Sequence, residues 1–278
     1  MNRGYCDLNA RGDRFIMNSR ISLIACAAAA MAFVTPTHAA DLLPATAPQP
    51  QAVQPNGWTF SFAPYFWVAG LDGKTQVFGL PTVDINQNFS DILKDLDFAF
   101  MAAGDARYDR FSVFTDIIYA RITTDAATPR GVVADEVDVK SVTFSALLGV
   151  GYTVYEDPKA RLDVVAGARY WHAETTIGLS GGLIGNVSRT DSANWVDGVA
   201  GIKGNYSLTD TVYLTGWGII GGGGADLDWD VLAGIGYKFN DTVSAVAGYR
   251  ALGVNYSNDG FTYDVIEHGP IFGAIIRF

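Results

Sequence analysis

Side chains of two kinds alternate along most segments of this 278-residue chain. In segment 227–239, apolar or aromatic residues occupy every second position, and the positions between them carry mainly Asp, Gly or Lys. Segment 142–152 repeats the pattern, with mainly Gly, Ser and Thr between its apolar residues. A period of two is typical of β-strands whose two faces meet different surroundings. The alternation therefore predicts an all-β chain.

A soluble β-sandwich and a transmembrane β-barrel both use strands of this kind. Most of the segments here reach the length of about 9–11 tilted residues that crosses a bilayer. Aromatic residues also gather at the ends of segments, where a membrane barrel places its interfacial girdles. These residues are Tyr108, Phe111, Tyr152, Tyr155, Tyr206, Tyr237 and Phe239. We therefore expect a transmembrane antiparallel up-and-down β-barrel.

The connections between the expected strands are alternately short and long. The short ones lie at 109–110, 156–159, 208–210 and 240–241, and the long ones at 124–135, 179–190, 221–226 and 257–260. Bacterial barrels keep short turns in the periplasm and long loops outside the cell. We therefore expect an outer-membrane protein of a Gram-negative bacterium with its N- and C-termini in the periplasm.

The expected strands number ten. They are 58–70, 97–108, 111–123, 138–155, 160–176, 191–207, 211–220, 227–239, 242–256 and 263–278. Segment 71–96 contains two hairpin arms, 74–79 and 82–88, each of which is too short to cross a bilayer. A twelve-strand barrel that uses both arms, or an eight-strand one, is the alternative. Residues 90–96 are expected to form one or two helical turns, with Ser90 as the N-cap. We interpret the whole segment as an extracellular or lumen-entering loop.

The first 39 residues have the pattern of a secretory signal peptide. Arg20 precedes the apolar run 21–34, and Ala39 ends a small-residue cleavage site. Met17 is an alternative start. The stretch 40–57, rich in Pro, Ala and Gln, is expected to be a flexible periplasmic lead-in to a barrel formed by residues 58–278.

Composition excludes several classes of function. The net charge of -10 argues against a nucleic-acid partner, which requires a basic face. Both cysteines, Cys6 and Cys26, lie in the signal peptide, so the mature chain has no disulfide and no Cys-bound metal. The glycine run 221–224 does not open a helix after a strand, so it is not a phosphate-binding loop. We expect no cofactor and no metal.

Several short motifs occur along the expected strands. They are Pro64-Tyr65-Phe66-Trp67, Gly167-Ala168-Arg169-Tyr170-Trp171, Trp195-Val196-Asp197-Gly198, Gly248-Tyr249-Arg250, Gly260-Phe261-Thr262-Tyr263-Asp264 with Gly269-Pro270, and Arg277-Phe278. The layout resembles a group of proteobacterial outer-membrane β-barrel proteins, mostly without assigned activity, in the style of OmpA-like and opacity-type surface proteins. We expect no peptidoglycan-binding domain of the OmpA pattern after the barrel. The resemblance implies a monomer among outer-membrane lipids and lipopolysaccharide, with Phe278 read by the barrel-insertion machinery.

The alternation directs eight charged residues into the lumen. They are Asp105, Arg107, Asp116, Arg169, Asp197, Lys203, Arg250 and Glu267. Charges at membrane depth must pair or line water. A ten-strand barrel is narrow, so we expect a structural network of ion pairs, with a polar conduit or gate as the alternative. Arg250 is expected to be its centre, because the neighbouring strands carry Asp228 and Asp230 on one side and Glu267 on the other.

Two histidines, His172 and His268, follow the signal peptide, and both are expected to face outward near the outer ends of their strands. His172 shares its face with Glu174, which would allow an acid–base pair. Neither histidine has a nucleophile beside it in the sequence, so packing at the membrane interface is the expected role.

These observations predict a non-catalytic outer-membrane barrel with an envelope-structural or surface-interaction role. A narrow passive channel for small solutes and an outer-leaflet lipid-modifying enzyme are the alternatives. A lumen in which each charge is paired would favour the sealed barrel, whereas a wet path with unpaired charges would favour the channel.

Overall fold

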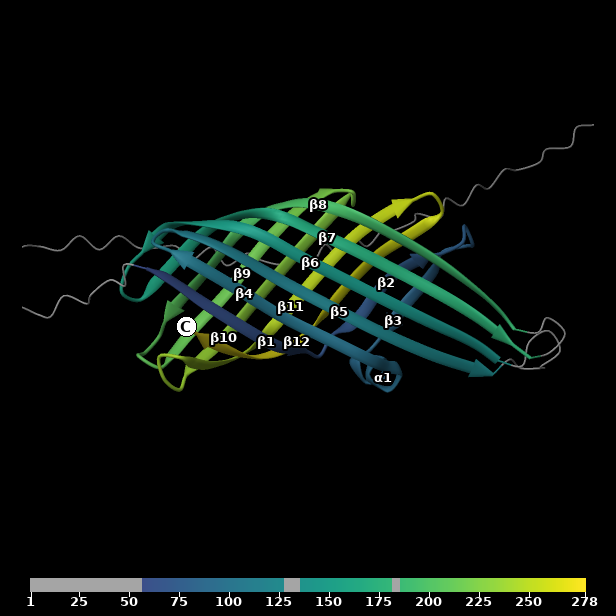
Figure 1. The fold of residues 1–278 in the computed structure, drawn as a ribbon, viewed down its shortest axis with the longest axis horizontal. Helices are drawn as coiled ribbons and strands as arrows, with labels where there is room; N and C mark the ends of the chain where they lie inside the picture. Colours follow the sequence, from purple (N-terminus) through teal and green to yellow (C-terminus); the bar gives the residue numbers. More distant parts are fainter. Residues whose placement is uncertain (1–56, 128–135, 182–185) are drawn as a thin grey trace, which may run out of the picture. The chain divides into compact units, whose positions relative to one another are not determined.

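The computed structural model describes residues 57–127, 136–181 and 186–278, except for the side chains of 125–127. The expected signal peptide and lead-in lie outside these residues, apart from Gly57. Ten long strands form a closed antiparallel barrel (Figure 1). They are β1 (Trp58–Trp67), β4 (Leu96–Tyr108), β5 (Phe111–Ala127), β6 (Glu136–Glu156), β7 (Ala160–Ser180), β8 (Val187–Ser207), β9 (Val212–Gly223), β10 (Leu227–Lys238), β11 (Val243–Asn258) and β12 (Phe261–Arg277). The predicted fold class is therefore confirmed.

Each long strand pairs with the next along the chain, and β1 pairs with β12 to close the barrel. The turns at 109–110, 157–159, 208–211 and 239–242 lie at one end, together with the start of β1 and the end of β12, and we call it the short-turn end. The opposite end, beyond β5–β8, is the long-loop end. At this other end, the expected long connections at 221–226 and 257–260 are short turns at 224–226 and 259–260, because the flanking strands extend further than expected. Strands β5–β8 extend further than expected at the long-loop end, because cross-strand pairing continues to Ala127↔Glu136 and Glu136↔Ser180. The Thr and Val residues there favour a pleated strand over a loop.

The segment between β1 and β4 is an ordered extension of the barrel wall. Strands β2 (Gly70–Gln76) and β3 (Val83–Gln87) form the expected hairpin, and β2 pairs with residues 262–268 of β12, just beyond the part of β12 that β1 covers. Helix α1 (Phe89–Asp95) follows. Its N-cap is Asn88 and not the expected Ser90, because the Asn88 side chain accepts a hydrogen bond from the Asp91 N–H.

The two faces of the strands differ as the alternation predicts. Leu148 and Val150 point outward with exposed fractions of 62% and 60%, whereas Leu147 points inward and is 3% exposed. Small inward positions make room for rings: a Cβ at Gly149 would collide with Phe114, and one at Gly236 would collide with Tyr213. Among the described residues, no helix is both long and apolar enough to cross a membrane.

Candidate functional site: the barrel lumen

Five charged side chains from opposite walls meet inside the lumen. This central charge layer consists of Asp116, Arg169, Asp228, Asp230 and Arg250, which are at most 7% exposed. The Arg250 guanidinium lies 2.8 Å from Asp116 and 2.7 Å from Asp230. The Arg169 guanidinium lies 2.7 Å from both Asp228 and Asp230. Asp230 therefore bridges the two arginines.

Aromatic side chains complete the hydrogen bonding of the central charge layer. The Tyr65 hydroxyl donates to Asp116 at 2.9 Å, the Trp217 indole donates to Asp230 at 2.9 Å, and the Trp171 indole donates to Asp228 at 2.8 Å. The Arg250 guanidinium also lies 5.2 Å from the centroids of the Trp67 and Trp217 rings, within the range of cation–π attraction.

All six carboxylate oxygens of the three aspartates accept at least one hydrogen bond. A buried charge is costly unless it is paired and its remaining lone pairs are satisfied. The central charge layer meets this requirement without any added ligand. The five side chains therefore form a fully hydrogen-bonded network, which fills the lumen at the height of the barrel where they lie.

An aromatic layer lies beside the central charge layer, toward the long-loop end. It comprises Trp171, Trp195, Tyr256, Phe261 and Tyr263, all at most 7% exposed. The ring of Trp195 stacks on Tyr256 at a centroid distance of 4.0 Å and on Trp171 at 5.8 Å. Leu252, Val254 and Val265 pack into the same cluster. Side chains thus fill the lumen at the aromatic layer as well as at the central charge layer.

The β2–β3 hairpin reaches across this end of the barrel. The Phe78 N–H in its turn donates to the Asp191 carboxylate of β8 at 2.5 Å, although β8 is not a sheet neighbour of the hairpin. Leu71 and Val77 pack against the buried cluster that contains the aromatic layer. The hairpin therefore adds a contact between opposite walls on the long-loop side.

The eight predicted lumen residues separate into three groups. Asp116, Arg169 and Arg250 belong to the central charge layer. Two pairs lie nearer the short-turn end: Lys203 with Asp105 at 2.6 Å, and Arg107 with Asp163 at 2.5 Å. Asp197 and Glu267 form no ion pair with the described residues. Asp197 is fully buried and accepts a hydrogen bond from the Ala225 N–H at 2.8 Å, while its second oxygen has no described partner.

The partners of Arg250 differ in part from the expectation. Asp230 is one of them, but Asp228 binds Arg169, and Glu267 forms no ion pair with Arg250. The second partner is Asp116 of β5, because the guanidinium extends across the narrow lumen instead of sideways along the wall. Asp163, the partner of Arg107, was not predicted. It shares the inward face of β7 with Arg169, so the alternation could have identified it.

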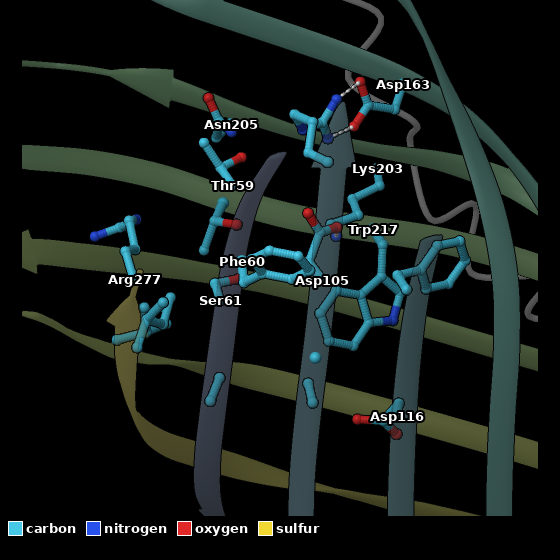
Figure 2. A pocket seen from close by; sticks show the side chains of 18 of the residues that line it. Thr59, Phe60, Ser61, Asp105, Asp116, Asp163, Lys203, Asn205, Trp217 and Arg277 are labelled. Atoms are coloured by element: carbon cyan, nitrogen blue, oxygen red, sulfur yellow. Dashed lines mark hydrogen bonds and ion pairs between the residues drawn. The ribbon is translucent and has the colours of Figure 1, made fainter. Parts of the chain in front are cut away.

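A cavity of about 840 Å³ occupies the lumen between the central charge layer and the short-turn end. Tyr65, Asp116 and Trp217 line its inner end. Asp105, Lys203 and Asp163 lie along it, and Thr59, Asn205 and Arg277 lie near its mouth (Figure 2). The cavity ends at the central charge layer and so forms a blind pocket.

Both histidines lie on the outer wall, as expected. His172 makes a hydrogen bond of 2.7 Å to Asn194, and no described contact joins it to Glu174. His268 lies between two partners: its Nδ1 is 2.7 Å from the Tyr249 hydroxyl, and its Nε2 is 2.9 Å from the Asp72 carboxylate. Within the described residues, no group of three or more side chains could hold a metal ion.

Comparisons with known proteins support the fold. A family model described as a protein of unknown function, DUF481, matches residues 134–262. No curated protein matches the sequence. The outer-membrane protease OmpT from Escherichia coli is 12% identical, with a TM-score of 0.50 over 81% of this chain and 98% of that chain. At such low identity, the likeness shows the fold alone, which is that of outer-membrane β-barrels.

Two further structures are less similar. The translocator domain of the autotransporter NalP from Neisseria meningitidis is 15% identical, with a TM-score of 0.44 over 81% of this chain and 91% of that chain. The attachment invasion locus protein Ail of Yersinia pestis is 14% identical, with a TM-score of 0.35 over 80% of this chain and 99% of that chain.

Proposed function

We propose that this chain is an integral outer-membrane β-barrel with a sealed lumen, which serves envelope structure or surface interaction and neither transports solutes nor catalyses a reaction. The observation that carries the proposal is the central charge layer, whose carboxylate oxygens are all hydrogen-bonded and whose charges are withdrawn from water. A conducting pore needs a continuous wet path, and paired, buried charges do not supply one.

The chemistry of the outer wall supports a position in the membrane. Exposed apolar side chains such as Leu148, Val150 and Ile220 suit contact with lipid tails. Aromatic pairs stand at the short-turn end, where Phe111 lies 5.2 Å from Tyr152 and Tyr237 lies 5.1 Å from Phe239, measured between ring centroids. Such rings favour the interface between lipid tails and water. Outer-membrane lipids and lipopolysaccharide are therefore the proposed surroundings.

The proposed orientation puts the short-turn end in the periplasm and the long-loop end outside the cell. The long strands β5–β8 would then rise above the outer leaflet and present a surface, as in the opacity-type proteins that the sequence resembles. We further propose that the chain works as a monomer and that Phe278 is read by the insertion machinery.

Solute entry into liposomes tests the sealed lumen. Purified, refolded protein is reconstituted into liposomes, and swelling is followed in isotonic solutions of small neutral and charged solutes, with a water-filled porin as the positive control. We expect protein-containing liposomes to swell no faster than empty ones. Swelling that depends on the amount of protein and on solute size would contradict the proposal and support the narrow channel.

An outer-leaflet lipid-modifying enzyme is the second candidate, and the hydrogen-bonded series Asp72–His268–Tyr249 favours it. In such a series, the carboxylate orients the imidazole, whose other nitrogen accepts a proton from the hydroxyl. Protein incubated with phospholipid and lipopolysaccharide vesicles would reveal this activity by mass spectrometry of the lipids. New lipid species that vanish in Tyr249→Phe and His268→Gln would establish the enzyme and overturn the non-catalytic role.

A further inference from the structure

The blind cavity at the short-turn end is large enough for a ligand. Its volume of about 840 Å³ falls in the range of small-molecule sites, which is about 300–1,000 Å³. The central charge layer closes its inner end, and its mouth lies between the starts of β1 and β11 and the end of β12. A molecule entering from this end would therefore be held in the lumen and could not pass through it.

The walls of the cavity differ in character. Strands β9–β12 contribute mainly apolar side chains, among them Ile219, Leu232, Val246, Ile271 and Ile275. Strands β4, β7 and β8 contribute the charged pairs Asp105–Lys203 and Arg107–Asp163. Phe114 of β5 and Leu147 of β6 also line the cavity, so apolar surface continues around its inner part. A lining that combines apolar surface with charged groups suits a ligand that has an apolar body and a polar head.

The charges near the mouth indicate the sign of the head. Lys203 and Arg107 each have a carboxylate partner, and Arg161 pairs with Glu156. Arg277 differs, because its one described side-chain hydrogen bond goes to the neutral Ser244 hydroxyl at 2.6 Å. No described carboxylate lies within 4.0 Å of its guanidinium, which therefore keeps donors free for an anion. A guanidinium fork matches a carboxylate or a phosphate.

We infer that this cavity binds a small anionic amphiphile, whose head contacts Arg277 and whose apolar body lies against Val246, Ile271 and Ile275. This site does not depend on the proposed envelope role, since a sealed barrel can hold a ligand in its periplasmic half. Asp109 and Asp241 of the short turns also line the mouth and would attract a cation instead. The sign of the head is therefore the point that the experiment must decide.

Three probes with the same body and different heads test the inference: octanoate, octylammonium and octan-1-ol. Binding is measured by isothermal titration calorimetry on the refolded full barrel in nanodiscs, after subtraction of the heats with empty nanodiscs. We expect saturable binding of one octanoate per barrel, at least about tenfold tighter than octylammonium, since a charge-assisted bidentate contact exceeds the 1.4 kcal/mol of a tenfold change.

Variants locate the site. Arg277→Gln should weaken octanoate at least about tenfold and leave octan-1-ol unchanged, whereas Arg161→Gln, at an arginine that is already paired, should leave octanoate unchanged. Val246→Trp fills the cavity, keeps Arg277 and should abolish saturable binding of all three probes. Tighter binding of octylammonium, absence of saturable octanoate binding, or octanoate binding that survives Val246→Trp would each overturn the inference.

Discussion

Arg250 of β11 and Asp116 of β5 form an ion pair across the lumen, with 2.8 Å between Nη2 of the arginine and Oδ1 of the aspartate. The two residues are 134 positions apart, and their strands are not neighbours in the sheet. Backbone pairing alone would leave the opposite walls connected only around the circumference. The Arg250–Asp116 pair instead connects them directly, in the layer that closes the lumen.

Replacement of Arg250 tests how much the central charge layer contributes to the free energy of unfolding. Arg250→Ala should lower the free energy of unfolding by about 3–5 kcal/mol, because it leaves Asp116 and Asp230 as buried carboxylates with lost partners. Arg250→Lys should cost less but still be measurable, since the planar fork is lost. Denaturant titration of the refolded barrel in detergent micelles measures both effects.

A matched control is Arg121→Ala, which removes an exposed arginine paired with Asp97. Exposed pairs contribute about 0–1 kcal/mol, so this variant should be nearly silent. An Arg250→Ala barrel as stable as the wild type, or more stable, would mean that Arg250 does not stabilise the lumen.

Two isosteric substitutions separate paired from unpaired buried carboxylates. Asp230→Asn should destabilise the barrel by about 3–5 kcal/mol, because two guanidiniums lose a shared anion. Asp197→Asn should be neutral or stabilising, since Asp197 has no described cation partner and an amide oxygen can still accept from the Ala225 N–H. Chemical denaturation of the two variants side by side makes the comparison. Equal losses of unfolding free energy in the two variants would show that the ion pairs of Asp230 do not stabilise the barrel.

Acid should weaken one short turn in a predictable way. The hydrogen bond from the Tyr155 hydroxyl to Asp157, followed by those from the backbone N–H groups of Lys159 and Ala160, lowers the pKa of the Asp157 carboxyl. A lowered folded-state pKa means that the carboxylate adds stability above the ordinary Asp pKa of about 3.9 and loses that contribution as the pH falls through the folded-state value.

The corresponding measurement compares the wild type with Asp157→Asn, which keeps an acceptor oxygen but cannot ionise. The wild type should be the more stable protein at pH 7, and the difference should shrink as the pH falls below the ordinary carboxyl range. A difference that is independent of pH would show that the Asp157 charge contributes nothing to the turn.

The proposed orientation predicts which ends of the strands are accessible on cells. Residues 40–278 contain no cysteine, so a single introduced cysteine is the one labelled thiol once the expected signal peptide is removed. Ser188→Cys at the long-loop end should react with a membrane-impermeant maleimide on intact cells, whereas Asp241→Cys at the short-turn end should react only after the outer membrane is permeabilised. The opposite pattern would mean an inverted barrel.

The strands and their facing were predictable from the sequence because a period of two depends only on local side-chain pattern. The extra length of β5–β8 was not, since Gly178 and the acidic residues Glu136 and Asp138 are of types depleted in strands, although the Val and Thr residues around them favour a strand. The pairing of β2 with β12 joins segments about 190 residues apart, which no local pattern reports.

The inward direction of Arg250 followed from the same alternation, but its partner on β5 did not. Which strands face each other across a lumen depends on barrel width and on strand stagger, and both emerge only when the sheet closes. The stacking of Trp195 on Tyr256 has the same origin, because β8 and β11 are not adjacent in the sheet.

Single-channel recording tests the central claim of a sealed lumen most directly. Purified wild-type protein is inserted into a planar lipid bilayer in symmetric salt, with a water-filled porin recorded in the same apparatus and with insertion verified by recovery of folded protein from the bilayer lipids. The central charge layer and the aromatic layer predict no stepwise conductance across the accessible voltage range. Reproducible conductance steps from the wild-type protein would contradict a lumen closed at Arg250, Asp116 and Asp230.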